Sequence, residues 1–317
     1  MNPVLHQRDS RFVLFGLGVD KTSWRGVGLL AAVFFGSLLI AAVLTPPLYW
    51  LVQLWHDRTG SANAQWLLDK GVDVYFDRIR MAAIVLGLPW LMSKCHLWSW
   101  RAMGLAFKAG DASIFAKCWA GGCLLIVGLA ILLPQPVWLT GQGPSFENIN
   151  QGVLIMLTAL AAGLLLGFLE EAIFRGMILR LFYTASKKPW HALVATSAFY
   201  AYTHFKVPTS VWHHVAPGVH WDTGLFVAFW TTFGITENFQ AAQFVVLWLL
   251  GMILGTLTLR TGSLLPAIGL HAGIVSAMFF FRGAGLGDTW WAALALVVVL
   301  GALVDPKSRI FPTTPSA

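Results

Sequence analysis

The chain has 317 residues, of which 57% are hydrophobic and only 11% are charged, and its mean hydropathy is +0.70. A soluble domain carries about 25% charged residues, so this composition excludes an ordinary soluble protein and indicates a membrane protein. The net charge of +7 comes without a basic stripe interleaved with aromatic residues. We therefore expect no nucleic-acid partner and assign the charge to loops that face the cytoplasm.

The hydrophobic runs predict an all-α, polytopic membrane helix bundle. A bilayer core about 30 Å thick requires about 20 apolar residues per helix. Eight segments meet or approach this length: 26–55, 79–93, 114–134, 151–183, 190–205, 240–259, 264–281 and 289–304. The first segment contains Pro46-Pro47, a pair that can break it into a span and an interfacial segment.

The distribution of lysine and arginine predicts the orientation of these helices. Basic residues precede the first span and cluster between the second and third, whereas loop 135–150 has none. Loop 56–78 holds three basic residues, partly offset by four aspartates. The positive-inside rule then puts both termini in the cytoplasm, which gives eight helices with an N-in and C-in topology.

Residues 168–176, FLEEAIFRG, bring three charges into the fourth predicted span. At a rise of about 1.5 Å per residue, Glu170 and Glu171 lie about 20 Å from the cytoplasmic end of that span. A charge at that depth costs about 2.5–3.5 kcal/mol on insertion scales. Such residues face the protein interior or a water-filled cavity, and a functional role is the default hypothesis.

Spacing separates the roles of these charges. Glu171 and Arg175 are one helical turn apart on the same face and can form an ion pair, but Glu170 lies about 100° around the helix. A structural salt bridge therefore leaves Glu170 unexplained. Two histidines fall on other predicted spans, His204 at the end of the fifth and His271 in the seventh. A carboxylate with imidazole groups is what the activation of a water molecule requires.

Three motifs follow one another along the chain. The first is Glu170-Glu171-Ala-Ile-Phe-Arg175, the second has Tyr200 four residues before His204, and the third runs from Arg260 to His271 as RTGSLLPAIGLH. In this order the motifs resemble those of the CPBP family. The family comprises intramembrane endopeptidases for CAAX-protein and bacteriocin processing, and its eukaryotic members cleave prenylated CAAX proteins. The resemblance covers about residues 150–280.

The resemblance implies a role for each motif residue. Glu170 corresponds to the general base that activates water, His204 to its partner, and His271 to the oxyanion donor or a metal ligand. Glu171 and Arg175 shape the site, and Tyr200 holds the position that is usually phenylalanine in the second motif. The implied organisation has four parts. Residues 1–25 form a cytoplasmic segment, and 26–149 form the amino-terminal helices. Residues 150–282 form a catalytic core with a long loop at 206–239, and 283–317 form a last helix with its cytoplasmic tail.

The third motif departs from the family at Val275, where a polar residue such as asparagine usually follows the histidine. Valine can neither donate a hydrogen bond nor bind a metal. Two interpretations therefore stay open: an active intramembrane endopeptidase, and a non-catalytic membrane scaffold or binding relative. A transporter is disfavoured because no paired repeat with broken helices is present.

The sequence also leaves open whether the site binds a metal ion. Glu171, His204 and His271 could supply three zinc ligands, but we favour a glutamate–histidine mechanism without an obligatory metal. In loop 206–239, His213, His214 and His220 lie beside tryptophans, which indicates the membrane interface more than a metal site. The expected setting is a bacterial cytoplasmic (inner) membrane, with the lipid bilayer and a membrane-associated peptide or protein substrate as partners.

Overall fold

The computed structural model describes residues 24–95, 97–98, 100, 103–105, 109–132, 148–205, 218–233 and 241–284. Over these ranges every regular element is a helix and none is a strand, which confirms the predicted all-α class. The chain divides into two compact units, and each is described by itself. The first comprises Met1–Trp24, His96–Tyr202 and Ala241–Ala317, and the second comprises Arg25–Cys95 and Thr203–Gln240.

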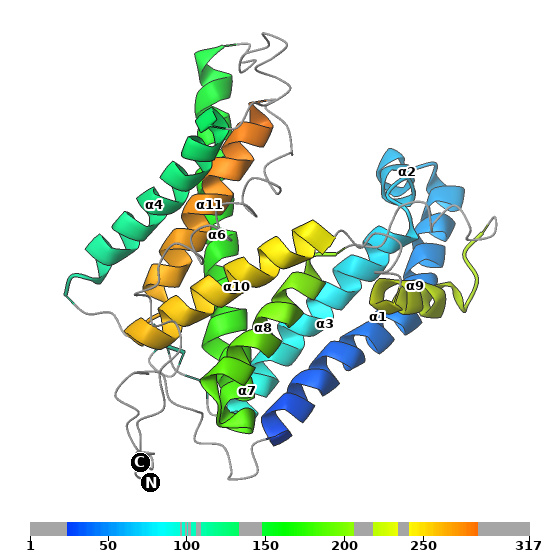
Figure 1. The fold of residues 1–317 in the computed structure, drawn as a ribbon. Coiled ribbons are helices and arrows are strands. Elements are labelled where there is room, and N and C mark those ends of the chain that lie inside the picture. Colours follow the sequence, from blue (N-terminus) through cyan, green and yellow to red (C-terminus); the bar gives the residue numbers. More distant parts are fainter. Residues whose placement is uncertain are drawn as a thin grey trace. The chain divides into compact units, whose positions relative to one another are not determined.

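In the first unit, α11 (Leu265–Gly283) packs against both α4 (Asp111–Leu132) and α6 (Ile149–Glu171), as Figure 1 shows. Glycines make this close approach possible. A side chain at Gly273 would collide with the carbonyl oxygen of Trp119 on α4, and a Cβ atom at Gly167 would lie 2.8 Å from the backbone nitrogen of Ala272. Membrane helices commonly pack through such small residues.

Two further clusters complete the core of the first unit. One joins α4, α10 (Ala241–Thr261) and α11 through buried residues such as Ile126, Leu250 and Ile274. The other joins α10 to α7 (Leu179–Ser186) and α8 (Pro189–Thr203) through Leu179, Leu193 and Leu259. The helix that carries His271 is therefore held from several sides.

The chain leaves the α-helical geometry directly after the two glutamates. The predicted span 151–183 is helical from 149 to 186, but α6 ends at Glu171 and the seven residues Ala172–Ile178 form a π-helix, η1, before α7 begins. Such π-helical segments are rare and occur frequently at functional sites. The sequence analysis did not predict this one.

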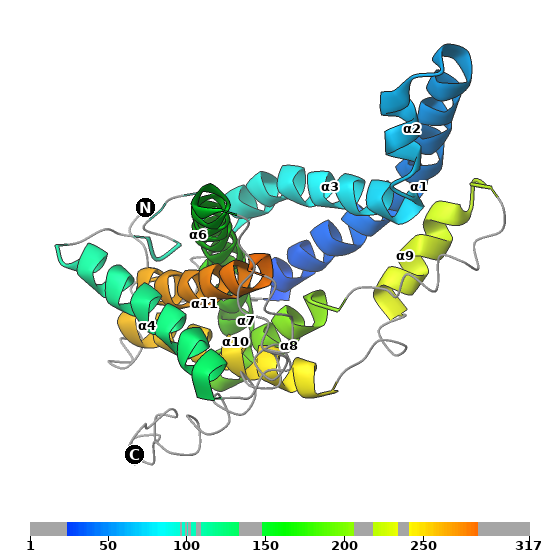
Figure 2. The same ribbon diagram turned by 90° about the horizontal axis from the view of Figure 1, so that it is seen from above.

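The second unit contains α1 (Trp24–Thr59), α2 (Ala62–Leu68), α3 (Val72–Lys94) and α9 (Thr223–Phe233). Its core joins α1, α3 and α9 through Leu38, Ala41, Ala42, Phe76 and Val227, and these helices are seen from above in Figure 2. The predicted loop 206–239 thus contains a helix. By its contacts, this helix belongs to the same compact unit as the amino-terminal helices.

The predicted break at Pro46-Pro47 is wrong, because α1 continues through both prolines. A proline within a helix leaves the carbonyl group four residues earlier without its donor, which for Pro46 is the carbonyl of Ala42. Gly224 of α9 approaches that carbonyl so closely that any side chain there would clash with its oxygen. Packing of α9 against the freed carbonyl offers a physical reason why the helix survives the prolines.

Five of the described helical segments are long and apolar enough to cross a membrane: Trp24–Thr59, Asp111–Leu129, Ile149–Ser186, Ala241–Thr261 and Leu265–Gly283. The predicted spans 79–93 and 190–205 are helical within α3 and α8 but are not among the five. Span 289–304 and both termini lie outside the described residues, so eight helices and the N-in, C-in topology stay predictions.

Candidate active site

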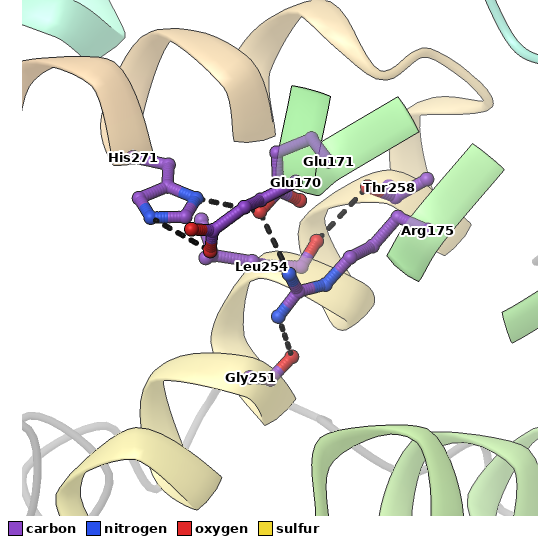
Figure 3. A network of polar contacts seen from close by, with 7 residues as sticks. All are labelled: Glu170, Glu171, Arg175, Gly251, Leu254, Thr258 and His271. Carbon is purple, nitrogen blue, oxygen red and sulfur yellow. Dashed lines mark hydrogen bonds and ion pairs between the residues drawn. The ribbon is translucent and has the colours of Figure 1, made fainter. Parts of the chain in front are cut away.

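A buried ion pair joins the end of α6 to η1. The Arg175 Nη1 atom lies 2.7 Å from Glu171 Oε1, and the two side chains are 1% and 0% exposed. Arg175 Nη2 also donates to the carbonyl oxygen of Gly251 on α10 at 3.2 Å (Figure 3). The pair predicted from the i,i+4 spacing is therefore present, and the arginine ties η1 to a second helix.

His271 of α11 contacts the same carboxylate oxygen. Its Nδ1 atom lies 2.8 Å from Glu171 Oε1, and the imidazole is buried (Figure 3). Glu171 is paired with the Arg175 guanidinium, and a carboxylate in an ion pair can only accept hydrogen bonds. Nδ1 must therefore carry the proton, and the bond sets the orientation of the ring.

The other ring nitrogen of His271 faces Glu170. The distance from Nε2 to Glu170 Oε2 is 3.7 Å, which is longer than a hydrogen bond. The Glu170 side chain is 27% exposed, whereas that of Glu171 is fully buried. The two adjacent glutamates thus have different surroundings: Glu171 is enclosed within a network of ion pairs, and Glu170 faces a more open region of the protein.

Tyr200 of α8 completes this group of side chains. It is 1% exposed and makes a side-chain hydrogen bond with Glu170, to which the phenol donates. The Arg175 guanidinium lies over its ring, 4.6 Å from the centroid, and the His271 ring meets it edge-on at 6.2 Å. Side chains from α6, η1, α8 and α11 therefore form one continuous cluster in the first unit.

The structure brings together five of the six predicted site residues: Glu170, Glu171, Arg175, Tyr200 and His271. The sixth, His204, follows α8 and falls in the second unit. The predicted convergence of His204 with the other residues stays a prediction.

The polar residue that the third motif lacks is not replaced by its neighbour. Val275 lies one turn after His271 on α11 and is half-buried. Ser276 is buried, and its Oγ atom lies against Gly163 on α6, two turns before Glu170. The chain therefore presents an apolar side chain at the position where the family usually has a hydrogen-bond donor.

The described residues contain no group of three or more His, Cys, Asp or Glu side chains that could hold a metal ion. Glu171 Oε1, a candidate zinc ligand atom, already contacts both Arg175 and His271. The mechanism without an obligatory metal stays a prediction. In the loop segment, His220 is exposed, and His213 and His214 lie outside the described residues.

Sequence reasoning missed two contacts of this cluster. It paired Glu171 with Arg175 alone, whereas the same oxygen also contacts His271. It treated Tyr200 only as an aromatic ring, whereas its hydroxyl group contacts Glu170. The tyrosine at a position that is usually phenylalanine was the available signal, because a buried phenol requires a hydrogen-bond partner.

A comparison with protein families gives a match over part of the chain. Residues 152–277 match the family model described as "Type II CAAX prenyl endopeptidase Rce1-like", and this range includes all three motifs. No curated protein and no solved structure matches the chain. Proteins of the matched family are proteases, consistent with the CPBP resemblance. Residues 152–277 are therefore similar to the Rce1-like type II CAAX prenyl endopeptidase family, and the chain that contains them is an integral membrane protein.

Proposed function

We propose that the protein is an intramembrane endopeptidase that hydrolyses a peptide bond in a membrane-associated protein or peptide. The observation that carries this proposal is the contrast between the two glutamates. A fully buried, ion-paired Glu171 orients His271, and a partly exposed Glu170 faces the opposite nitrogen of that histidine. A purely structural salt bridge would not need the second carboxylate.

In the proposed reaction, Glu170 acts as a general base. It takes a proton from a water molecule, whose oxygen then attacks the carbonyl carbon of the scissile peptide bond. The protonated Glu170 returns that proton to the leaving nitrogen as the carbon–nitrogen bond breaks, which yields a carboxylic acid and an amine; the acid then gives its proton to the amine, so that the products are a carboxylate and an ammonium group. A general base positioned in this way contributes about 100- to 10,000-fold to the rate.

His271 is the proposed stabiliser of the oxyanion that forms during the attack. Its Nδ1–H is committed to Glu171, so Nε2 is the nitrogen that is directed toward the reacting atoms. Donation from Nε2 requires a proton on that nitrogen as well as on Nδ1, and such a hydrogen bond would offset the charge on the carbonyl oxygen. By resemblance to the family, His204 assists Glu170.

The family match supports a substrate that is associated with the lipid bilayer, and the expected compartment remains a bacterial cytoplasmic membrane. The test is cleavage of a panel of membrane-associated peptides, prenylated and unprenylated, by purified wild-type protein in lipid vesicles. Parallel reactions contain a zinc chelator, and a zinc protease is the control for chelation. We expect cleavage that the chelator does not change.

Two outcomes would contradict parts of this proposal. Chelator-sensitive cleavage that zinc restores would replace the metal-free mechanism with a zinc-dependent one. The absence of cleavage across the panel, together with binding of one of its peptides, would favour the non-catalytic scaffold, in which Val275 has removed part of the oxyanion site.

A further inference from the structure

We propose that Tyr200 is a positioning residue, whose hydroxyl group holds the Glu170 carboxylate in place for proton transfer. The inference rests on the proposed role of Glu170 as the general base. It concerns the hydroxyl group of Tyr200. The second motif usually has phenylalanine at this position, and phenylalanine would supply the same ring without the hydroxyl.

The ring of Tyr200 is fixed by its neighbours. Phe174 of η1 meets it edge-on with 5.0 Å between ring centroids, and His271 of α11 does so at 6.2 Å. The guanidinium of Arg175 lies 4.6 Å from the ring centroid, which is a cation–π contact. A ring that is 1% exposed and contacted by three side chains has little freedom to change its rotamer.

The hydroxyl group of this fixed ring contacts the less constrained of the two glutamates. Glu170 is 27% exposed, and its Oε2 atom lies 3.7 Å from His271 Nε2, beyond hydrogen-bond length. A glutamate side chain has several rotatable bonds, so the ion pair with His271 alone would confine it loosely. A directional hydrogen bond from a rigid donor restricts the carboxylate to one position.

Arg175 links both glutamates through this arrangement. The same guanidinium pairs with Glu171 and covers the ring that donates to Glu170. The orientations of His271 and Glu170 therefore both depend on the buried Arg175 guanidinium. Arg175 positions the ring of Tyr200, and the hydroxyl group of that ring positions Glu170.

The test is Tyr200→Phe, which keeps the ring and its contacts but removes the donor. We expect kcat to fall about 10- to 100-fold, the equivalent of a hydrogen bond to a charged group, with KM unchanged. A fall in kcat at unchanged KM would show that positioning of the base is lost and that substrate binding is not. Tyr202→Phe, on the same helix, is the matched control and should retain the wild-type kcat and KM.

Glu170→Gln, measured in parallel, separates the two proposals. If Glu170→Gln cleaves as well as wild type, the general-base proposal fails. If Glu170→Gln is inactive but Tyr200→Phe retains the wild-type kcat, only the positioning role is overturned.

A second measurement does not depend on activity. Tyr200→Phe should lower the Tm of the purified protein in detergent, and it should leave the Tm unchanged in a Glu170→Ala background. An equal loss of Tm in both backgrounds would show that the hydroxyl does not act through Glu170.

Discussion

The Nδ1 atom of His271 lies 2.8 Å from Oε1 of Glu171, although the two residues are 100 positions apart in the chain. The contact joins α11 to α6 at the point where the π-helix η1 begins. It gives the adjacent glutamates different contacts, because Glu171 binds one nitrogen of the histidine and Glu170 faces the other. Four predictions follow from this arrangement, and a fifth tests the chemistry itself.

Arg175→Ala should destabilise the folded protein. It would leave Glu171 in a buried position with His271 as its remaining partner, and breaking a buried pair from one side costs about 3–5 kcal/mol. We expect a lower Tm in detergent and poor recovery of monodisperse protein. Arg282→Ala, at an exposed position in the last turn of α11, is the control and should behave as wild type. A well-folded Arg175→Ala variant with full activity would show that the pair is not needed.

Glu171→Gln should reduce activity more than stability. The amide can present an N–H group to Nδ1, which favours the wrong tautomer of His271. The equivalent change in serine-protease triads lowers kcat by about 10,000-fold. We expect a marked loss of kcat, measured with the best peptide of the panel, and a Tm that falls less than that of Arg175→Ala. An unchanged kcat would refute the orienting role of Glu171.

Gly167→Ala should separate the helices that carry the site. The added methyl group would lie 2.8–2.9 Å from backbone and side-chain atoms of Ala272, the residue next to His271. Overpacking of this kind typically costs about 1–3 kcal/mol, and we expect loss of both Tm and activity. Gly128→Ala on α4, where an added methyl group meets nothing within 4 Å, is the matched control. Equal behaviour of the two variants would contradict the close packing of α6 against α11.

Val275→Asn should leave activity unchanged or raise it. It adds a donor one turn from His271, and one oxyanion donor is worth about 100- to 1000-fold in rate. Val275→Leu, which keeps the position apolar, should match wild type. The measurement is kcat/KM for both variants on the same peptide. A loss of activity confined to Val275→Asn would indicate that the site requires an apolar residue here.

Much of this arrangement could be predicted from local sequence. The apolar runs predicted most of the helices, and the i,i+4 spacing predicted the pair of Glu171 and Arg175, because both depend on geometry within one helix. Contacts between helices could not be predicted in the same way. The bond between Glu171 and His271 depends on how closely α6 and α11 approach, which glycines at the interface determine.

Two other features could not be predicted from the local sequence. No residue type between Ala172 and Ile178 predicts a π-helix. The contact of Arg175, within this segment, with Gly251 on another helix cannot be predicted from local propensity either. Local propensity also predicted a break at Pro46, whereas packing against Gly224 overrides it.

The most direct test of the central claim is the rate of peptide cleavage by Glu170→Gln. The amide is nearly isosteric with the carboxylate but cannot accept a proton from water, so the account predicts an unchanged Tm and a kcat lower by about 100- to 10,000-fold. The assay needs purified protein, the peptide that wild type cleaves best, and equal occupancy confirmed by binding. Cleavage by Glu170→Gln at the wild-type rate would contradict the assignment of Glu170 as the general base.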